Sequence, residues 1–205
     1  MNATDKVTPR TILVTGATGS IGQVVCRTLI ASGERLSVLS RDPTKARHCF
    51  GDSIRVLTSL DQIESAEHID AVINLAGAPM AKWLWTRKRR RVLIESRLQI
   101  TQAIVDLIAR LVEKPKVLVS ASAITYYGVH GEKRLIESDK AGATFQSKLC
   151  STWEDTARQA ERFGTRVCLL RLGVVLDHAG EVLPKLMIPL KLRWHVVFGS
   201  GKQWI

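Results

Sequence analysis

Short apolar runs alternate along the chain with longer segments in which apolar residues recur every three or four positions. The runs are strand-sized and almost continuously apolar, as at Ile12, Leu13 and Val14. Continuous runs of this length are typical of strands that are buried on both faces of a parallel sheet. They predict six strands, at residues 11–15, 36–40, 54–57, 71–75, 117–120 and 167–171.

Helical periodicity fills several of the intervening segments. A helix is expected over about residues 20–32, after a glycine-rich turn, and another over about 145–162, with Gly164 as its C-cap. The strongest pattern, between the fourth and fifth strands, is an apolar stripe of Leu93, Ile100, Ile104, Leu107 and Leu111. Repeated strand–helix–strand order predicts an α/β fold with a doubly wound parallel sheet, the Rossmann fold. No repeat or linker divides the 205 residues, so a single domain is expected.

Composition narrows the class of protein. Apolar residues make up 45% of the chain and charged residues 24%, as in ordinary globular proteins. The four cysteines are scattered, and the five histidines lack ligand spacing, so neither a disulfide framework nor a metal site is predicted. No apolar stretch approaches the roughly 18 residues of a membrane span. We therefore expect a soluble, cytoplasmic protein with no membrane partner.

The net charge of +11 is concentrated in one basic run, residues 87–91. One interpretation is the solvated first turns of a helix, although cations there oppose the helix dipole. The other is a docking surface for nucleic acid. Five adjacent charges point all round a helix and form no single docking face, so nucleic acid is the weaker hypothesis. An anionic small ligand would also suit the charge.

The strongest chemical signal lies between the first strand and the first helix. It follows Thr15 and consists of Gly16, Ala17, Thr18, Gly19, Ser20, Ile21 and Gly22. Glycines let the chain turn sharply out of the strand, approach a pyrophosphate closely and pack the helix on the sheet. Unpaired amides at the helix N-terminus then face the phosphate charge. The turn predicts a dinucleotide-binding site.

The end of the second strand indicates which dinucleotide. An NAD enzyme would place an acid there for the ribose hydroxyls, whereas this chain has Ser40 and Arg41, followed by Asp42. A guanidinium can clamp a 2′-phosphate and stack on adenine. We therefore expect NADP(H) as the cofactor in preference to NAD(H), while Asp42 leaves a ribose contact open.

Together these and later motifs resemble the extended, atypical branch of the short-chain dehydrogenase/reductase superfamily, in particular its epimerase-family proteins. The G-x-x-G-x-x-G spacing of the turn is one part of the resemblance. The others are residues 73–79, Ser96, Arg97, Thr101, 126–128, 145–150, Trp153, Glu154, 171–176 and 199–203.

The resemblance implies roles for residues at the ends of the later strands. It adds to the cofactor site the residues Asn74, Leu75, Ala76, Gly77, Ser120, Lys148 and Gly173. It makes Ser122 the catalytic serine and Lys148 the lysine that binds the nicotinamide ribose. The tyrosine that the superfamily places four residues before this lysine is Thr144 here. Tyr126 and Tyr127, in the loop after the fifth strand, are the candidate replacements.

Two functions remain open. The first is an NADP(H)-binding oxidoreductase or epimerase-like enzyme acting on a small polar substrate. The second is a module that holds NADP(H) without turnover, which Thr144 favours. Family members continue into a substrate-binding region, of which we expect residues 178–205 to be a truncated beginning. The apolar stretch at 183–197 should then be poorly covered, with homo-oligomerisation as one consequence.

Overall fold

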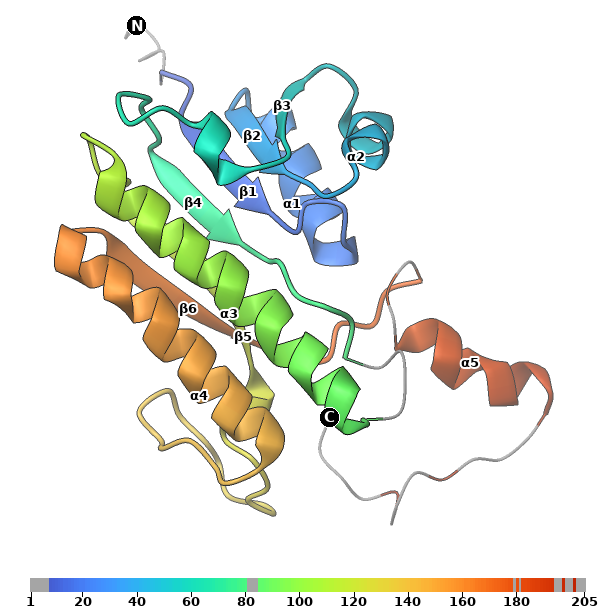
Figure 1. Ribbon diagram of the computed structural model, residues 1–205. Coiled ribbons are helices and arrows are strands. Elements are labelled where there is room, and N and C mark those ends of the chain that lie inside the picture. Colours follow the sequence, from blue (N-terminus) through green and yellow to red (C-terminus); the bar gives the residue numbers. More distant parts are fainter. Residues whose placement is uncertain are drawn as a thin grey trace, which may run out of the picture.

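The computed structural model describes residues 8–80, 85–178, 180, 182–193, 197 and 201 (Figure 1). Its centre is one sheet of six parallel strands in the order β3-β2-β1-β4-β5-β6. The strands are β1 (Thr11–Thr15), β2 (Arg35–Leu39), β3 (Ile54–Leu57), β4 (Ala71–Asn74), β5 (Val117–Ala123) and β6 (Arg166–Leu172). The predicted doubly wound α/β fold is confirmed. The sheet reverses its order between β1 and β4, which is where α/β proteins of this type bind ligands.

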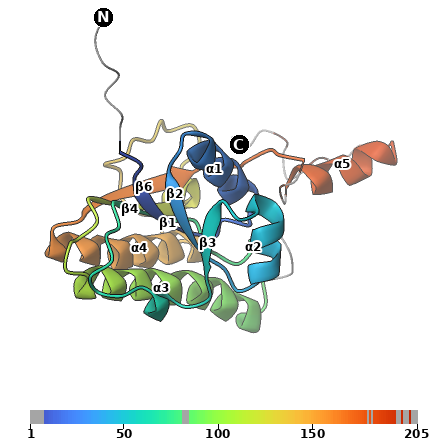
Figure 2. The same ribbon diagram turned by 90° about the horizontal axis from the view of Figure 1, so that it is seen from above.

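Helices cover both faces of the sheet. The helices of the described chain are α1 (Ser20–Ala31), α2 (Pro43–Phe50), α3 (Arg87–Arg110), α4 (Phe145–Arg158) and α5 (Leu183–Lys191). Figure 2 shows α1 and α2 on one face and α3 and α4 on the other, while α5 extends away from the sheet. Short 3₁₀ turns occupy Leu60–Gln62, Ile124–Tyr126 and Gln159–Phe163.

The two helical layers bury two separate apolar clusters, and β1 contributes to both. Leu13 packs with the α3 residues Ile104 and Ile108, whereas Ile12 and Val14 pack on the other face with α1 and α2. Successive side chains of a strand point to opposite faces, so a strand covered on both sides must be apolar at every position. This is why β1 shows a continuous run and not an alternating one.

The predicted elements differ from the observed ones mainly in length. β5 continues to Ala123 because Ala121, Ser122 and Ala123 pair with β6. The helix expected to reach residue 162 ends at Arg158 and continues as a 3₁₀ turn, but Gly164 caps it in the left-handed region (φ 84°), as predicted.

The helix α2 had no predicted counterpart. Its sequence is mostly polar, so it lacks an apolar stripe. The local signal was the pair Asp42-Pro43, since Asp is a preferred N-cap and Pro suits the first helical position.

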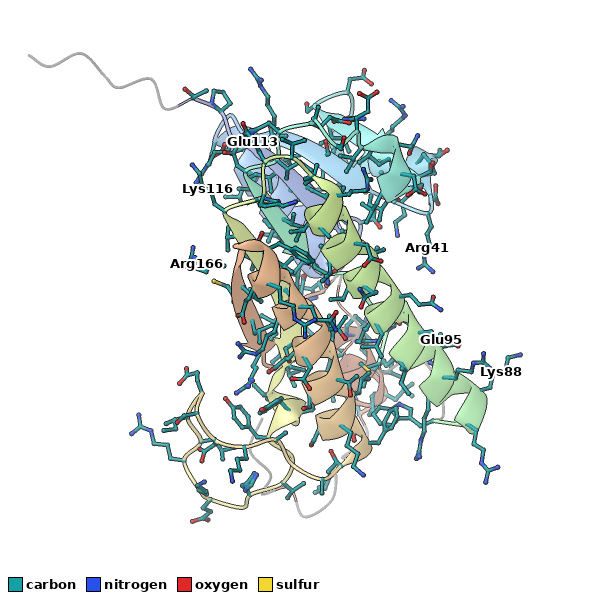
Figure 3. The ribbon with its side chains drawn as sticks, turned by 60° about the vertical axis from the view of Figure 1, so that its left-hand side comes forward. Arg41, Lys88, Glu95, Glu113, Lys116 and Arg166 are labelled. Atoms are coloured by element: carbon teal, nitrogen blue, oxygen red, sulfur yellow. The ribbon has the colours of Figure 1, made fainter. Side chains whose placement is uncertain are left out.

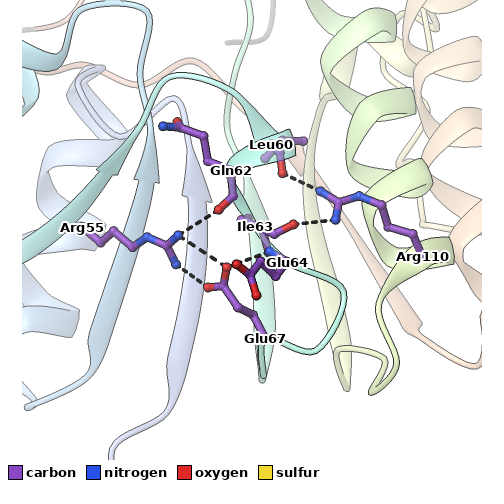
Figure 4. Close-up of polar contacts among 7 residues, drawn as sticks. All are labelled: Arg55, Leu60, Gln62, Ile63, Glu64, Glu67 and Arg110. Atoms are coloured by element: carbon purple, nitrogen blue, oxygen red, sulfur yellow. Dashed lines mark hydrogen bonds and ion pairs between the residues drawn. The ribbon is translucent and has the colours of Figure 1, made fainter.

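Two arginines hold the loop between β3 and β4 (Figure 4). Arg55, on β3, donates to the Gln62 carbonyl at 2.9 Å and forms an ion pair with Glu67. Arg110, at the end of α3, donates to the carbonyls of Ile63 and Leu60 at 2.5 and 2.6 Å. The Gln62 side chain in turn accepts from the Thr58 amide at 2.7 Å. The loop is therefore tied to both neighbouring elements.

The basic run forms the first turn and a half of α3, with Thr86 as its N-cap. Three of its five cations make contacts within the fold. These contacts join Arg89 to the Pro79 carbonyl, Arg90 to the Phe145 ring at 5.1 Å and Arg91 to Glu95 at 2.6 Å. Arg87 and Lys88 are exposed, and Figure 3 shows Lys88 projecting from the end of α3. The run thus forms the start of a helix, and four of its five side chains are exposed.

The last part of the described chain contains α5, and three apolar residues near it are more than half exposed: Ile188, Leu192 and Val197. Of the motif at 199–203, only Gly201 lies among the described residues. None of the described helices has the length and apolar character needed to cross a bilayer.

Candidate functional site

In the turn after β1, two glycines stand where a larger residue would not fit. Gly16 has φ 73°, and a Cβ there would lie 2.5 Å from the Leu75 carbonyl carbon and oxygen. A Cβ on Gly22 would lie 2.3 Å from the Gly16 carbonyl oxygen. The turn therefore packs against the end of β4 and against the first turn of α1 without space for any other residue.

The start of α1 leaves its amides available. Gly19 is the N-cap; within the described chain no side chain caps this helix, and its first turn holds no acidic residue. The first intrahelical bond runs from the Gln23 amide to the Gly19 carbonyl, so the amides of Ser20, Ile21 and Gly22 precede it. The N-termini of α2, α3 and α4 are each capped by a side chain, from Asp42, Thr86 and Thr144 respectively. Among these four starts, α1 is the one suited to an anion.

A cleft of about 600 Å³ opens beside this turn. It brings together eight residues of the predicted cofactor site: Gly16, Thr18, Gly19, Ser40, Arg41, Leu75, Ala76 and Gly77. Residues outside the predicted cofactor site complete its lining: Thr15, Leu39, Lys45, Thr58, Ala78, Glu95, Ser96, Gln99, Ile100 and Ala103. Ser20, Ile21 and Gly22 form the adjacent first turn of α1.

The segment after β4 is held in place by α3. The Ala78 amide donates to Ser96 Oγ at 3.0 Å, and Arg97 donates to the Ala78 carbonyl at 3.1 Å. A Cβ on Gly77 would lie 3.0 Å from the Arg97 guanidinium carbon. Ser96 and Arg97 thus position the wall of the cleft, a role that their place in the motif did not reveal.

The two charged residues after β2, Arg41 and Asp42, have different surroundings. Arg41 is exposed and lines the cleft, and Figure 3 shows it projecting outward. The Asp42 side chain accepts from the Lys45 amide at 2.9 Å as the N-cap of α2. Ser40 Oγ donates to the Asp42 carbonyl at 2.9 Å. Asp42 is thus engaged in local structure, and it is absent from the described residues that line the cleft.

Two of the predicted cofactor residues have fully buried side chains that join neighbouring strands. Asn74 accepts from Thr15 Oγ1 at 2.7 Å and donates to Thr101 Oγ1 at 2.9 Å and to Ser120 Oγ at 3.3 Å. Trp153 Nε1 also donates to Thr101, at 2.8 Å. This network ties the carboxyl ends of β1, β4 and β5 to α3 and α4. Neither the Asn74 nor the Ser120 side chain is exposed to the cleft.

Ser122, the predicted catalytic serine, is 3% exposed and belongs to another buried cluster. Its hydroxyl donates to Glu154 Oε1 at 2.5 Å. Glu154 also accepts two bonds from Arg171, each of 2.9 Å, in a bidentate ion pair. The sequence placed Glu154 and Arg171 only within family motifs; the structure shows that they hold the serine.

Arg171 also contacts both candidate tyrosines, Tyr126 and Tyr127. It donates to Tyr127 Oη and to the Glu137 carbonyl, both at 2.9 Å, and its guanidinium carbon lies 3.5 Å from the Tyr126 ring centre. The hydrogen bond to Glu154 raises the pKa of Arg171, so this guanidinium stays charged. Tyr127 and Arg171 line a separate hollow of about 560 Å³ beside β6.

The remaining candidates lie on exposed surface. Lys148 is exposed on the first turn of α4, and Gly173 is exposed directly after β6. Thr144 is the N-cap of α4: it accepts from the Ser147 amide at 3.1 Å and lies 2.7 Å from Ser147 Oγ. Of the described residues that line the cleft, none is Ser122, Tyr126, Tyr127 or Lys148. The structure thus gathers most cofactor candidates in one cleft and places the catalytic candidates beside β5, β6 and α4.

Comparison with known proteins identifies the family. The model of the NAD dependent epimerase/dehydratase family matches residues 12–204. The chain belongs to this family. The family resemblance read from the motifs is confirmed, and the protein is an NAD(P)-binding Rossmann protein of the epimerase family.

Three similar proteins show how far the match extends. Epimerase family protein YfhF of Bacillus subtilis is 33% identical over 199 residues, which cover 95% of this chain and 64% of that protein. The chloroplastic SDR39U1 homolog of Arabidopsis thaliana is 32% identical over 208 residues, 98% of this chain and 59% of that one. The crystal structure of human epimerase family protein SDR39U1 with NADPH has a TM-score of 0.78 at 28% identity and covers 94% of this chain and 63% of that one. This chain therefore spans less than two thirds of the length of these relatives.

Proposed function

We propose that the cleft beside the glycine turn binds NADP(H) in preference to NAD(H). The observation that carries this proposal is the uncapped start of α1 at Gly19, which lines the same cleft as Arg41, a cation without an ion pair in the described part of the chain. Amides at a helix N-terminus favour a pyrophosphate, and a guanidinium at the end of the second strand favours a 2′-phosphate.

The lining of the cleft fits the other parts of a dinucleotide. Leu39, Leu75, Ile100 and Ala103 give it an apolar side that suits the face of an adenine ring. Arg41 and Lys45 supply positive charge beside this side, while Asp42 is engaged as a helix cap. The human relative solved with NADPH supports the same choice of cofactor.

We assign to the protein an oxidoreductase or epimerase-like activity on a small polar substrate. A bound nicotinamide supplies hydride transfer, and the chain supplies binding and orientation. The candidate catalytic serine is Ser122; its hydroxyl donates its proton to Glu154, so toward a substrate its oxygen can act only as an acceptor. Tyr127 accepts from Arg171 and keeps its own proton to donate. Lys148, exposed on α4, is the candidate for the ribose hydroxyls.

A second candidate function is cofactor binding without turnover. The position of the superfamily's tyrosine holds Thr144, whose side chain caps α4. Ser122 is buried, and its hydroxyl is bonded to Glu154. A site with these two features supports a sensor or a structural use of NADP(H).

Calorimetric titration of NADPH and NADH against the parent protein tests the first proposal. We expect tighter binding of NADPH, and we expect Arg41→Ala to remove the preference, since one charge-assisted contact contributes about 1.5–3 kcal/mol, roughly ten- to a hundredfold in affinity. Arg47→Ala is the matched control, because Arg47 lies on α2 without lining the cleft. Equal affinities of the parent for both cofactors would overturn the assignment.

Turnover separates the two candidate functions. With NADPH bound, sugar-nucleotide and simple carbonyl substrates should be consumed if the protein is an enzyme, and Tyr127→Phe should abolish this while NADPH affinity stays unchanged. Binding of NADPH with no turnover on either class would favour the non-catalytic module.

A further inference from the structure

The first turn of α2 places a second cation in the cofactor cleft. Lys45 is the third residue of α2, and its exposed side chain lines the cleft together with Ser40, Arg41 and Thr58. Among the described residues no carboxylate forms an ion pair with Arg41 or with Lys45. Two unpaired cations four residues apart therefore border one end of the cleft.

The acid between these cations is kept out of the cleft. Asp42 Oδ1 accepts from the Lys45 backbone amide at 2.9 Å, so the carboxylate faces the start of α2. Its own backbone is held on both sides, because Ser40 Oγ donates to the Asp42 carbonyl and accepts from the Asp42 amide at 3.2 Å. A carboxylate directed into the cleft would repel a phosphate, and capping directs the Asp42 carboxylate toward the start of α2 instead.

We infer that Lys45 is a second ligand of the 2′-phosphate and that Asp42, through its role as helix cap, helps to set the preference for NADP(H). The inference deepens the proposed function and rests on it. A phosphate monoester carries about −1.5 to −2 charges at neutral pH, so a single guanidinium leaves it partly uncompensated. Arg41 with its planar fork and Lys45 with its compact ammonium together match that charge.

The principal test is Lys45→Met, which keeps the length of the side chain and the backbone amide that Asp42 accepts from. We expect NADPH affinity to fall about tenfold and NADH affinity to stay within about twofold of the parent. The affinity for adenosine 2′,5′-bisphosphate, a probe without nicotinamide, should fall by the same factor as the affinity for NADPH. The loss should shrink as salt is raised, because the contact lies at an exposed rim.

Lys116→Met is the matched control. Lys116 is an exposed lysine that precedes β5, at the amino ends of the strands and thus at the opposite edge of the sheet from the cleft (Figure 3). Its substitution should leave the affinity for both cofactors unchanged. If Lys45→Met weakened NADPH and NADH equally, or weakened neither, the assignment of Lys45 would be overturned.

Asp42→Asn tests the second half of the inference, since asparagine also caps helices. Unchanged NADH affinity is expected; a loss would mean that Asp42 contacts a ribose hydroxyl, which contradicts its placement. The proposed function fails separately: a parent protein that binds neither cofactor, or both equally, removes the 2′-phosphate site and this inference with it. A parent that prefers NADPH but is insensitive to Lys45→Met overturns only the inference.

Discussion

Two polar regions lie at the carboxyl ends of the strands, and they differ in whether their hydrogen-bonding groups have partners within the protein. In the cleft beside β1, β2 and β4, the first amides of α1 and the cations Arg41 and Lys45 have no partner within the described chain. In the cluster beside β5 and β6, Ser122, Glu154 and Arg171 are bonded to one another. The first region therefore offers groups that a ligand can satisfy, and the second already has its partners within the described chain.

The two regions differ in whether their polar groups already have partners in the protein itself. A buried charge without a partner is costly, so Glu154 and Arg171 must satisfy each other. Amides and cations at an open rim stay hydrated in the empty protein and can exchange water for phosphate. Substitutions in the cluster should therefore act on stability, and substitutions in the cleft on affinity.

The largest effect is expected from Glu154→Ala. Its side chain is 4% exposed and that of Arg171 is 14% exposed, so the substitution leaves a buried guanidinium without its carboxylate. The free energy of unfolding should fall by about 3–5 kcal/mol in denaturant titrations. Ser122→Ala, which removes only one hydrogen bond from the same cluster, should cost about 1 kcal/mol. Similar small losses for both variants would show that the ion pair is not structural.

Gly22→Ala should have a smaller effect on stability and a clear one on binding. The added Cβ would meet the Gly16 carbonyl oxygen at 2.3 Å, and displacing the turn should cost about 1–3 kcal/mol. The displaced amides should also bind NADPH less tightly. Gly173→Ala is the control for folding, because a Cβ there meets nothing within 4 Å. Wild-type stability of Gly22→Ala in thermal unfolding would contradict the observed packing of the turn.

The smallest of these effects is expected from Thr144→Ala, which removes the N-cap of α4 and should lower the unfolding free energy by about 1 kcal/mol. Thr144→Ser should keep most of the stability that the cap contributes. Thr144→Tyr, which introduces the phenol usual in the superfamily, should lose the cap as well, so any gain in turnover would come with reduced stability. Equal stability of the Ala and Ser variants by chemical denaturation would argue against a capping role.

Much of the fold followed from local patterns. The apolar run at Ile12, Leu13 and Val14 predicted a strand covered on both faces, and its neighbours pack in two clusters as expected. Gly164 marked a helix end in the left-handed region. The helix α2 was missed because only Ala46, Cys49 and Phe50 pack toward the sheet, and three residues in one short polar helix make too weak a periodic pattern.

Some features of the candidate site could likewise be predicted from local sequence, and others could not. Local sequence predicted the glycine turn and Arg41, because a tight turn and a nucleotide-binding strand end require particular residue types. It did not separate the four catalytic candidates from the cleft, and it gave no role to Glu154. Those relations join residues far apart in the chain, such as Ser122 and Glu154.

By itself, then, the sequence determined the parallel α/β architecture, the glycine turn with its free amides, and the cation at the end of β2. Backbone conformation and burial on two faces depend on near neighbours, so they can be read from spacing. Only the tertiary structure decided that Ile100 and Ala103 of α3 form a wall of the cleft, and that Asp42 turns toward α2 while Lys45 lines the cleft. Which side chains share a cleft depends on how the crossover helices return to the sheet, and on which hydrogen bonds compete for each polar group once the helices are packed.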